Sequence, residues 1–301
     1  MPNTLGHFGV QGPLSRGLFR GVDVRWIYLG CLLPDVPWIL RRAVESGFVT
    51  RVDPFDLRLY VYAQASLAIT LLLCGACAAW SAAPRRVFAL LGLNALLHLL
   101  LDACQIKWGN GVLIAAPFSW DATRFGLFWP ESLPTYLITA AGAIVIVCEL
   151  LAPRRAVAAI VVDRRRCVAS ALLLLAYALA PLLAMQAVDA HDVHHIRTLR
   201  EIRERPGRGI EIDRAPFVRE GDRGFIQLWT GERLEIVGPL PEGVGRLSLQ
   251  GRFEDEDTIR LDAVHGHRFH RDLASYVGLL ALALLWLRPW ARRGGDGRRL
   301  S

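Results

Sequence analysis

Long apolar runs separated by short polar connections make up the first 188 residues of the chain. A shorter run, 24–40, is interrupted by Pro34, Asp35 and Pro37, which predicts a broken or re-entrant segment lined by protein or water. Together with the continuous runs it predicts a polytopic α-helical membrane protein with about six membrane segments. The five continuous apolar runs are 58–80, 87–104, 134–152, 167–188 and 272–287.

Residues 189–271 follow a different pattern. A short charged helix is predicted over 196–206, ended by Pro206. After it, apolar and polar residues alternate in short runs separated by glycine and proline, which is typical of strands. Five such runs favour an inserted small all-β domain of OB type, with a small sandwich as the alternative. The runs are 209–218, 224–230, 233–238, 246–253 and 258–267.

We therefore predict three parts: a membrane helical domain over 1–188, an extracytoplasmic β domain over 189–271, and a final membrane helix with a basic cytoplasmic tail over 272–301. The first 20 residues lack a long apolar core and a cleavage site, so no secretory signal peptide is predicted. Insertion would then depend on the internal spans.

Arginines in the short connections predict the orientation of the chain. Arg85, Arg86, the connection 153–166 and the tail 288–301 all fall on one side if the segments alternate, and short basic loops are typically cytoplasmic. The predicted location is therefore the bacterial inner membrane, with 105–132 and 189–271 outside. Three arginines do not fit this simple rule, because Arg41, Arg42 and Arg51 fall on the outer side.

The net charge of +7 is unevenly distributed. Residues 189–272 hold 14 arginines against 17 acidic residues, so the basic excess lies in the short connections and reports orientation. The external part lacks a ladder of arginines and aromatics, which excludes nucleic acid as a partner. Membrane lipid, and a protein partner for the external domain, remain the expected partners. All six cysteines lie in or beside apolar runs, which argues against a disulfide framework.

A polar stripe crosses the apolar run 87–104. Asn94, His98 and Asp102 are four residues apart each time, so they share one helix face. Ionisable groups in a span are costly and normally face partners or water. His98 and Asp102 are able to ligate one metal ion, with Asn94 orienting His98 through its second nitrogen. The alternative is a hydrogen-bonded contact between helices without metal.

Short motifs in a fixed order surround this stripe: "MPNTLGHFG" at the start, "GCLLPDVPWILRR" at 30–42, and "VLIAAPFSWDATRFGLFW" at 112–129. Over about the first 130 residues the chain resembles the LexA-regulated, membrane-bound type of bacterial metal-dependent hydrolase. The resemblance implies metal ligation by His7, Asp35, His98 and Asp102. His7 joins this set only if residues 1–20 fold back into the bundle. The resemblance also implies an adjoining loop containing Phe118, Trp120 and Arg124, in which Arg124 holds an anionic group.

Two histidine-rich stretches flank the external domain. "DAHDVHH" at 189–195 offers His191, His194 and His195 as accessory metal donors, and "HGHRFHRD" at 265–272 offers more. The alternative is that these are ordinary histidines at the membrane–water boundary.

The predicted function is a membrane-embedded metal-dependent hydrolase of an ester or phosphoester at the outer face, where lipid-linked esters are available. The expected cofactor is a divalent metal ion, with zinc first. Asp35 or Asp102 acts as a general base if it is not occupied as a ligand. The sequence contains no nucleophile elbow, P-loop or dinucleotide motif. The alternative is a non-enzymatic membrane scaffold or sensor whose external domain binds a partner. A third function, transport, would be favoured by an inverted repeat, which the sequence does not show clearly.

Overall fold

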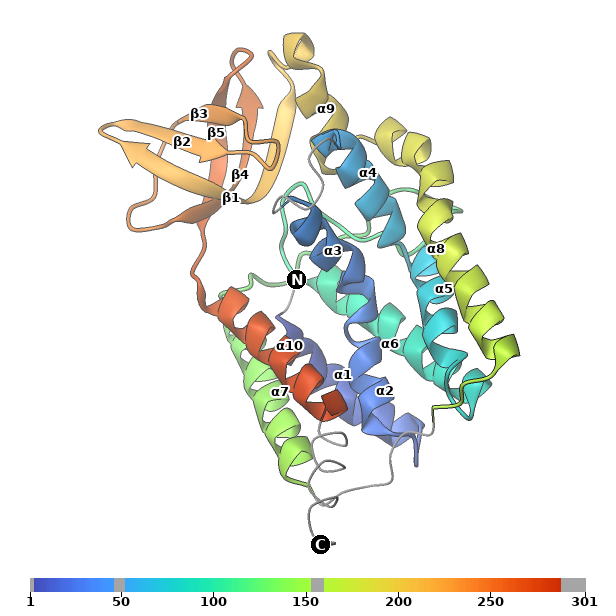
Figure 1. Cartoon of the computed structure of the whole chain (residues 1–301). Coiled ribbons are helices and arrows are strands. Elements are labelled where there is room, and N and C mark those ends of the chain that lie inside the picture. The colour runs from blue at the N-terminus through green and yellow to red at the C-terminus, as the bar shows by residue number, and fades with distance from the viewer. Residues whose placement is uncertain (1–2, 46–51, 153–159, 288–301) are drawn as a thin grey trace, which may run out of the picture.

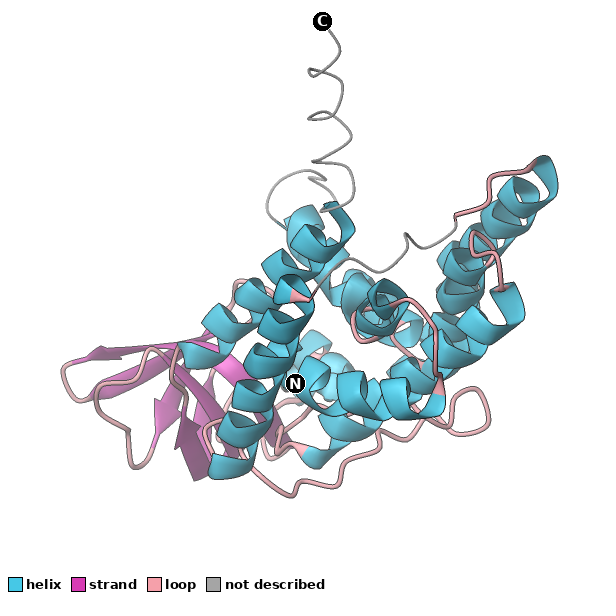
Figure 2. Cartoon of the chain, turned by 90° about the horizontal axis from the view of Figure 1, so that it is seen from below, coloured by secondary structure: helices cyan, strands magenta, loops and turns pink. Residues whose placement is uncertain are grey.

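The computed structural model of the chain describes residues 3–45, 52–152 and 160–287. Helices form most of the molecule, and five strands form a separate barrel at one end of the helical part (Figure 1). In the view turned by 90°, the strands gather at one side of the helices (Figure 2). The prediction of a helical part with a small β domain is confirmed at this level.

Among the described residues, four helices are long and apolar enough to cross a membrane, and a bent pair of helices makes a fifth if it counts as one span. The pair is bent by 69° at Ala65 and Ser66. The four helices are α6 (Pro84–Cys104), α7 (Leu133–Leu151), α8 (Arg164–Ala190) and α10 (His270–Leu287), and the pair is α4 (Pro54–Gln64) with α5 (Leu67–Ala78).

The sixth predicted segment is not among the candidate spans of the described residues, so six spans are not confirmed. Residues 24–43 fold as α2 (Val24–Gly30), the 3₁₀ turn η1 (Leu33–Asp35) and α3 (Val36–Ala43), each far shorter than the roughly 20 residues that a bilayer requires. The prolines that broke the apolar pattern lie at the start of η1 and α3. The interruption that the prolines predicted is therefore present between α2 and α3, and it contains Asp35.

The sequence pattern did not predict α1 (Thr4–Leu18). Asn3 begins it by accepting a hydrogen bond from Gly6 N at 2.9 Å. The helix packs closely against α7, since a Cβ added to Gly142 would lie 1.8 Å from the Leu5 carbonyl oxygen. Residues 1–20 thus do fold back into the bundle as far as they are described, which brings His7 to the interior.

The five predicted strands are all present, and they close into a barrel in the order β1-β2-β3-β5-β4. Every pairing is antiparallel except that of β3 with β5. Alternate side chains fill the interior, for example Ile226, Leu234, Leu247 and Ile259. The strands are β1 (Gly209–Glu220), β2 (Arg223–Gln227), β3 (Arg233–Val237), β4 (Arg246–Phe253) and β5 (Thr258–Gly266).

The charged helix expected over 196–206 is shorter than predicted. Three short pieces connect α8 to the barrel instead, and the last ends before Pro206. They are η3 (Val193–His195), α9 (Ile196–Arg200) and η4 (Ile202–Glu204).

Polar contacts fix the barrel to the loops at one end of the helices. Glu211 of β1 accepts hydrogen bonds from Gly109 N and from Arg124, both at 2.7 Å. Glu131 accepts from His265 at 3.2 Å and from His267 at 3.0 Å. Although burial alone raises the pKa of Glu131, these two hydrogen bonds hold it well below its usual range. The barrel therefore has a defined position against the helical part.

Candidate metal centre

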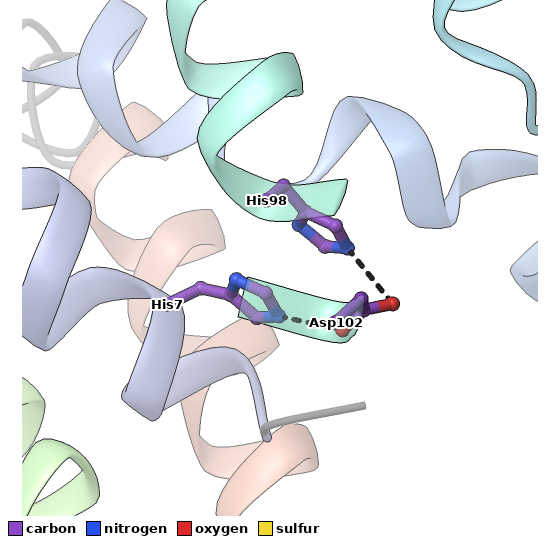
Figure 3. A group of neighbouring side chains, drawn as sticks. All are labelled: His7, His98 and Asp102. Carbon is purple, nitrogen blue, oxygen red and sulfur yellow. Dashed lines mark ion pairs between the residues drawn. The ribbon is translucent and has the colours of Figure 1, made fainter. Parts of the chain in front are cut away.

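Three distant segments of the chain converge at the end of α6 that lies nearest the barrel. α1 supplies His7, η1 supplies Asp35, and α6 supplies His98 and Asp102; Figure 3 shows the two histidines and Asp102 facing one another. His7, His98 and Asp102 are buried, with relative exposures of 0%, 0% and 2%. The structure thus brings together all four residues that the resemblance named.

The two imidazoles are held in one orientation by their Nδ1 atoms. The rings stack with centroids 3.8 Å apart and an angle of 3° between their planes. His98 Nδ1 donates to the Cys31 carbonyl at 2.7 Å. Gln11, oriented with its amide oxygen toward His7, accepts from Nδ1 at 3.0 Å and donates to Asn94 Oδ1 at 3.0 Å. With Nδ1 protonated, each neutral ring presents the lone pair of Nε2.

These lone pairs face carboxylate oxygens. His7 Nε2 lies 3.5 Å from Asp102 Oδ1, while His98 Nε2 lies 3.5 Å from Asp35 Oδ1 and 3.8 Å from Asp102 Oδ2. His7 Nε2, His98 Nε2, Asp35 Oδ1 and Asp102 Oδ1 are buried without a hydrogen-bond partner among the described residues. Buried acceptors facing one another are unfavourable unless a proton or a metal ion lies between them.

A divalent ion fits this arrangement. Ligand atoms that bind zinc tetrahedrally at about 2.0–2.2 Å stand about 3.4 Å from one another, close to the separations of the facing pairs. The donor set, two imidazole nitrogens with carboxylate oxygens, suits zinc and neighbouring divalent metals. The geometry therefore supports His7, His98 and Asp102 as ligands and places Asp35 within reach as a fourth.

Lys107 was not identified from the sequence as part of this site. Its Nζ lies 3.3 Å from Asp102 Oδ2, and its side chain is almost fully buried. Since Lys107 neutralises one oxygen of Asp102, the other oxygen is left to face His7. The sequence signal was the presence of the chain's single lysine five residues beyond Asp102.

The prediction for Asn94 was wrong. It does not contact the second nitrogen of His98, which is bonded to the Cys31 carbonyl. Instead, Asn94 Oδ1 accepts from Ser15 Oγ at 3.0 Å and faces the Gln11 amide. Asn94 therefore acts only indirectly, through Gln11 and His7, because the Cys31 carbonyl at the end of α2 occupies the second nitrogen of His98.

The other expected participants lie elsewhere. Arg124 pairs with Glu211 of the barrel at 2.7 Å, so its charge is directed away from the four candidate ligands. Trp120 packs in an apolar cluster around α4 and the end of α8. His194 meets Arg58 at 2.9 Å through Nδ1.

The accessory histidines are not brought to the candidate centre either. His191 meets the Ala187 carbonyl at 2.8 Å, and His195 lies near Asp192. His191, His194 and His195 all lie outside the group of candidate ligands found among the described residues. They follow α8, whose end packs against α4 and not against α6.

A second group, Glu131, His265 and His267, also has ligand atoms close together. Here each carboxylate oxygen accepts from an imidazole, at 3.2 and 3.0 Å, and His265 stacks on Trp129 with ring centroids 3.7 Å apart. None of its ligand atoms is among the buried atoms that lack a partner. This group therefore acts as a docking contact for the barrel, in contrast to the cluster around His98.

A cavity of about 510 Å³ connects the candidate metal centre with the barrel. His98, Asp102 and Lys107 line its inner end, and Arg214 and Arg246 of the barrel line the opposite wall. His98 and Asp102, two of the four candidate ligands, are thus accessible to a small molecule or to the head of a larger one.

No protein-family model, curated protein or solved structure matches the chain.

Proposed function

We propose that the chain is a membrane-embedded metal-dependent hydrolase that acts on an ester or phosphoester at the outer face of the bacterial inner membrane. The observation that carries this proposal is the set of four buried ligand atoms, on His7, Asp35, His98 and Asp102, that face one another without hydrogen-bond partners. We expect zinc to be the metal, because two imidazoles and carboxylates form a preferred donor set for it.

Each residue has a role in this proposal. His7, His98 and Asp102 bind the ion, and Asp35 serves either as the fourth ligand or, when not bound, as the general base. Gln11 and the Cys31 carbonyl fix the two rings. A bound divalent ion polarises an ester oxygen and lowers the pKa of a water molecule that it holds.

The directions of two helices support the proposed location. α6 and α8 begin with arginines, and both run toward the end of the helical part at which the barrel lies (Figure 1). Short basic connections are typically cytoplasmic, so the barrel, which we infer to be of OB type, lies outside. The cavity then opens toward the outer leaflet, where lipid-linked esters are available.

The metal content of purified full-length protein tests the proposal. We expect about one divalent ion per chain in the wild type, by analogy with sites of three or four protein ligands, and a loss of most of it in H98A and D102A. H191A is the matched control, since His191 is a histidine outside the cluster. Gel filtration and circular dichroism show whether each variant folds, and D102N provides a variant of nearly unchanged shape.

The scaffold alternative makes the opposite prediction. If the buried histidines and carboxylates only fix the helices, the wild type contains no stoichiometric metal and the same substitutions strongly destabilise it. A metal-free wild type that shows no hydrolysis after zinc is added would overturn the hydrolase proposal.

A further inference from the structure

The cavity beside the candidate metal centre is lined mainly by cations. Seven basic side chains line it against four carboxylates, those of Glu45, Asp102, Asp213 and Asp272. The cations come from both parts of the molecule. The helical part contributes Arg41, Arg42, Arg58 and Lys107, and the barrel contributes Arg214 and Arg246.

Some of these charges are already neutralised. Arg41 pairs with Glu45 at 2.8 Å, and Arg214 lies 3.5 Å from Glu131 and 3.7 Å from Asp272. These ion pairs offset part of the positive charge of the cavity, while its other cations keep theirs.

Arg42, Arg58 and Arg246 have no carboxylate partner among the described residues. Arg246 donates to the Arg214 carbonyl at 3.2 Å, and Arg58 faces the His194 ring at 2.9 Å. Arg58 Nε is buried and without a hydrogen-bond partner. The guanidinium groups of Arg42 and Arg246 are therefore available to an anion. Arg58 adds a third positive charge beside them, and its guanidinium carbon also lies 4.5 Å from the centroid of the Trp229 ring.

The charge of the cavity distinguishes between the two kinds of ester. A carboxylic ester is neutral and gains little from guanidinium groups, whereas a phosphate ester carries negative charge and presents oxygens that match the planar guanidinium fork. Cations lining a cavity of low dielectric attract anionic ligands most strongly. Tyr276 of α10 also lines the cavity and is exposed, so the cavity reaches the surface beside a membrane helix.

We infer that the substrate is a phosphate ester whose phosphate group binds between the candidate metal centre and the guanidinium groups of Arg42, Arg58 and Arg246. The role of the phosphate as the reacting group rests on the proposed hydrolase function; its binding does not. In this inference the barrel supplies part of the substrate site through Arg246.

Calorimetric titration of full-length protein in detergent, run with and without added zinc, tests this inference with three probes. Inorganic phosphate and dihexanoyl phosphatidic acid carry the anionic group, and dihexanoylglycerol is the neutral ester. We expect the two anionic probes to bind and to bind more weakly as NaCl is raised. Phosphatidic acid binding at least about tenfold more tightly than phosphate identifies a lipid head group, and equal affinity identifies a water-soluble phosphate compound.

Variants R42Q and R246Q remove one charge from each part of the molecule. We expect each to weaken binding of the anionic probes about threefold, and the double variant about tenfold, because both side chains are solvated at the cavity wall. R252Q is the matched control: Arg252 also lies on β4 and donates to one backbone carbonyl, that of Gly207 at 2.8 Å, but it does not line the cavity. R252Q should bind phosphate as the wild type does.

The outcomes separate this inference from the proposed function. If the double variant binds phosphate as tightly as the wild type, or if the neutral ester binds as tightly as phosphatidic acid, the inference is wrong even when metal-dependent hydrolysis is found. If phosphate binding depends on Arg42 and Arg246 but the protein holds no metal and hydrolyses no ester, the anion site stands and the hydrolase proposal fails.

Discussion

Replacing Gln11 by leucine tests the metal centre without removing a candidate ligand. Gln11 is fully buried, and its amide lies 3.0 Å from both His7 Nδ1 and Asn94 Oδ1. Q11L keeps most of the side-chain volume but leaves the His7 N–H without an acceptor. The ring then loses both its fixed orientation and part of its basicity.

The expected effect follows from this lost hydrogen bond. Removing an outer-sphere partner of a ligating histidine weakens metal binding by about 10- to 100-fold. This corresponds to about 1.4–2.7 kcal/mol of binding free energy. Zinc affinity is measured by competition with a chromophoric chelator in detergent solution at constant pH.

Q64L is the matched control for Q11L. Gln64 is also a buried glutamine of the helical part, and it donates to the Tyr177 carbonyl at 3.3 Å, away from the candidate ligands. Its loss should leave zinc affinity within about twofold of the wild type, because it contacts no ligand. If Q11L, shown by gel filtration to be folded, binds zinc as tightly as Q64L, then Gln11 does not position a ligating His7 and our reasoning is refuted.

Three further predictions concern folding and docking. G142A should destabilise the protein by at least about 1–3 kcal/mol, because a Cβ at this position meets the backbone of α1. G17A is the control, since a Cβ there meets nothing within 4 Å and should not destabilise the protein. Thermal unfolding measures both variants. R205M should lower the free energy of unfolding of the barrel by about 3 kcal/mol, because the fully buried Arg205 donates to Glu232 and its loss leaves that carboxylate unpaired. Urea titration followed by far-ultraviolet circular dichroism measures this change. The protection factors of backbone amides at the barrel contact, which correct for the intrinsic pH dependence of exchange, should fall as pH is lowered below 6.5, because burial lowers the pKa of His267 and the folded state then binds fewer protons than the unfolded state. They should fall again below 4.5, where the contribution of the low-pKa carboxylate of Glu131 is lost, and protection that is unchanged down to pH 4 would contradict this assignment.

The strands and the polar stripe were predictable from the sequence for a simple physical reason. Each strand buries alternate residues, so the period of two is visible in the sequence, as in Ile210 and Ile212 of β1. His98 and Asp102 stand out because ionisable residues in an apolar helix require partners. Local periodicity was therefore sufficient for the elements and for half of the candidate site.

The parts that were missed depend on contacts between distant segments. α1 buries polar residues, His7, Gln11 and Ser15, so an apolar pattern does not reveal its inner face. Arg246 reaches the cavity only because the barrel docks onto the loops after α6. Neither fact is encoded in the local pattern of one segment.

The run 24–40 also depends on contacts between distant segments. The run 24–40 has enough apolar residues to suggest a sixth segment, but its prolines divide it into α2 and α3 with η1 between them. Asp35 is the last residue of η1, and its Oδ1 lies 3.5 Å from His98 Nε2. The segment that interrupts the apolar pattern therefore supplies one of the candidate ligands, Asp35.

The location of the ligands also connects the site with the folding of the helical part. α1 has a polar inner face and α6 has a polar stripe, and each would be unfavourable against lipid on its own. Packed together, they satisfy Gln11, Ser15 and Asn94 with one another, yet the Nε2 atoms of both histidines stay without partners. Hydrogen bonding therefore explains why α1 folds back but does not complete the contact. A cation shared by His7 of α1 and His98 of α6 would complete it, and its binding free energy would then contribute to the docking of α1.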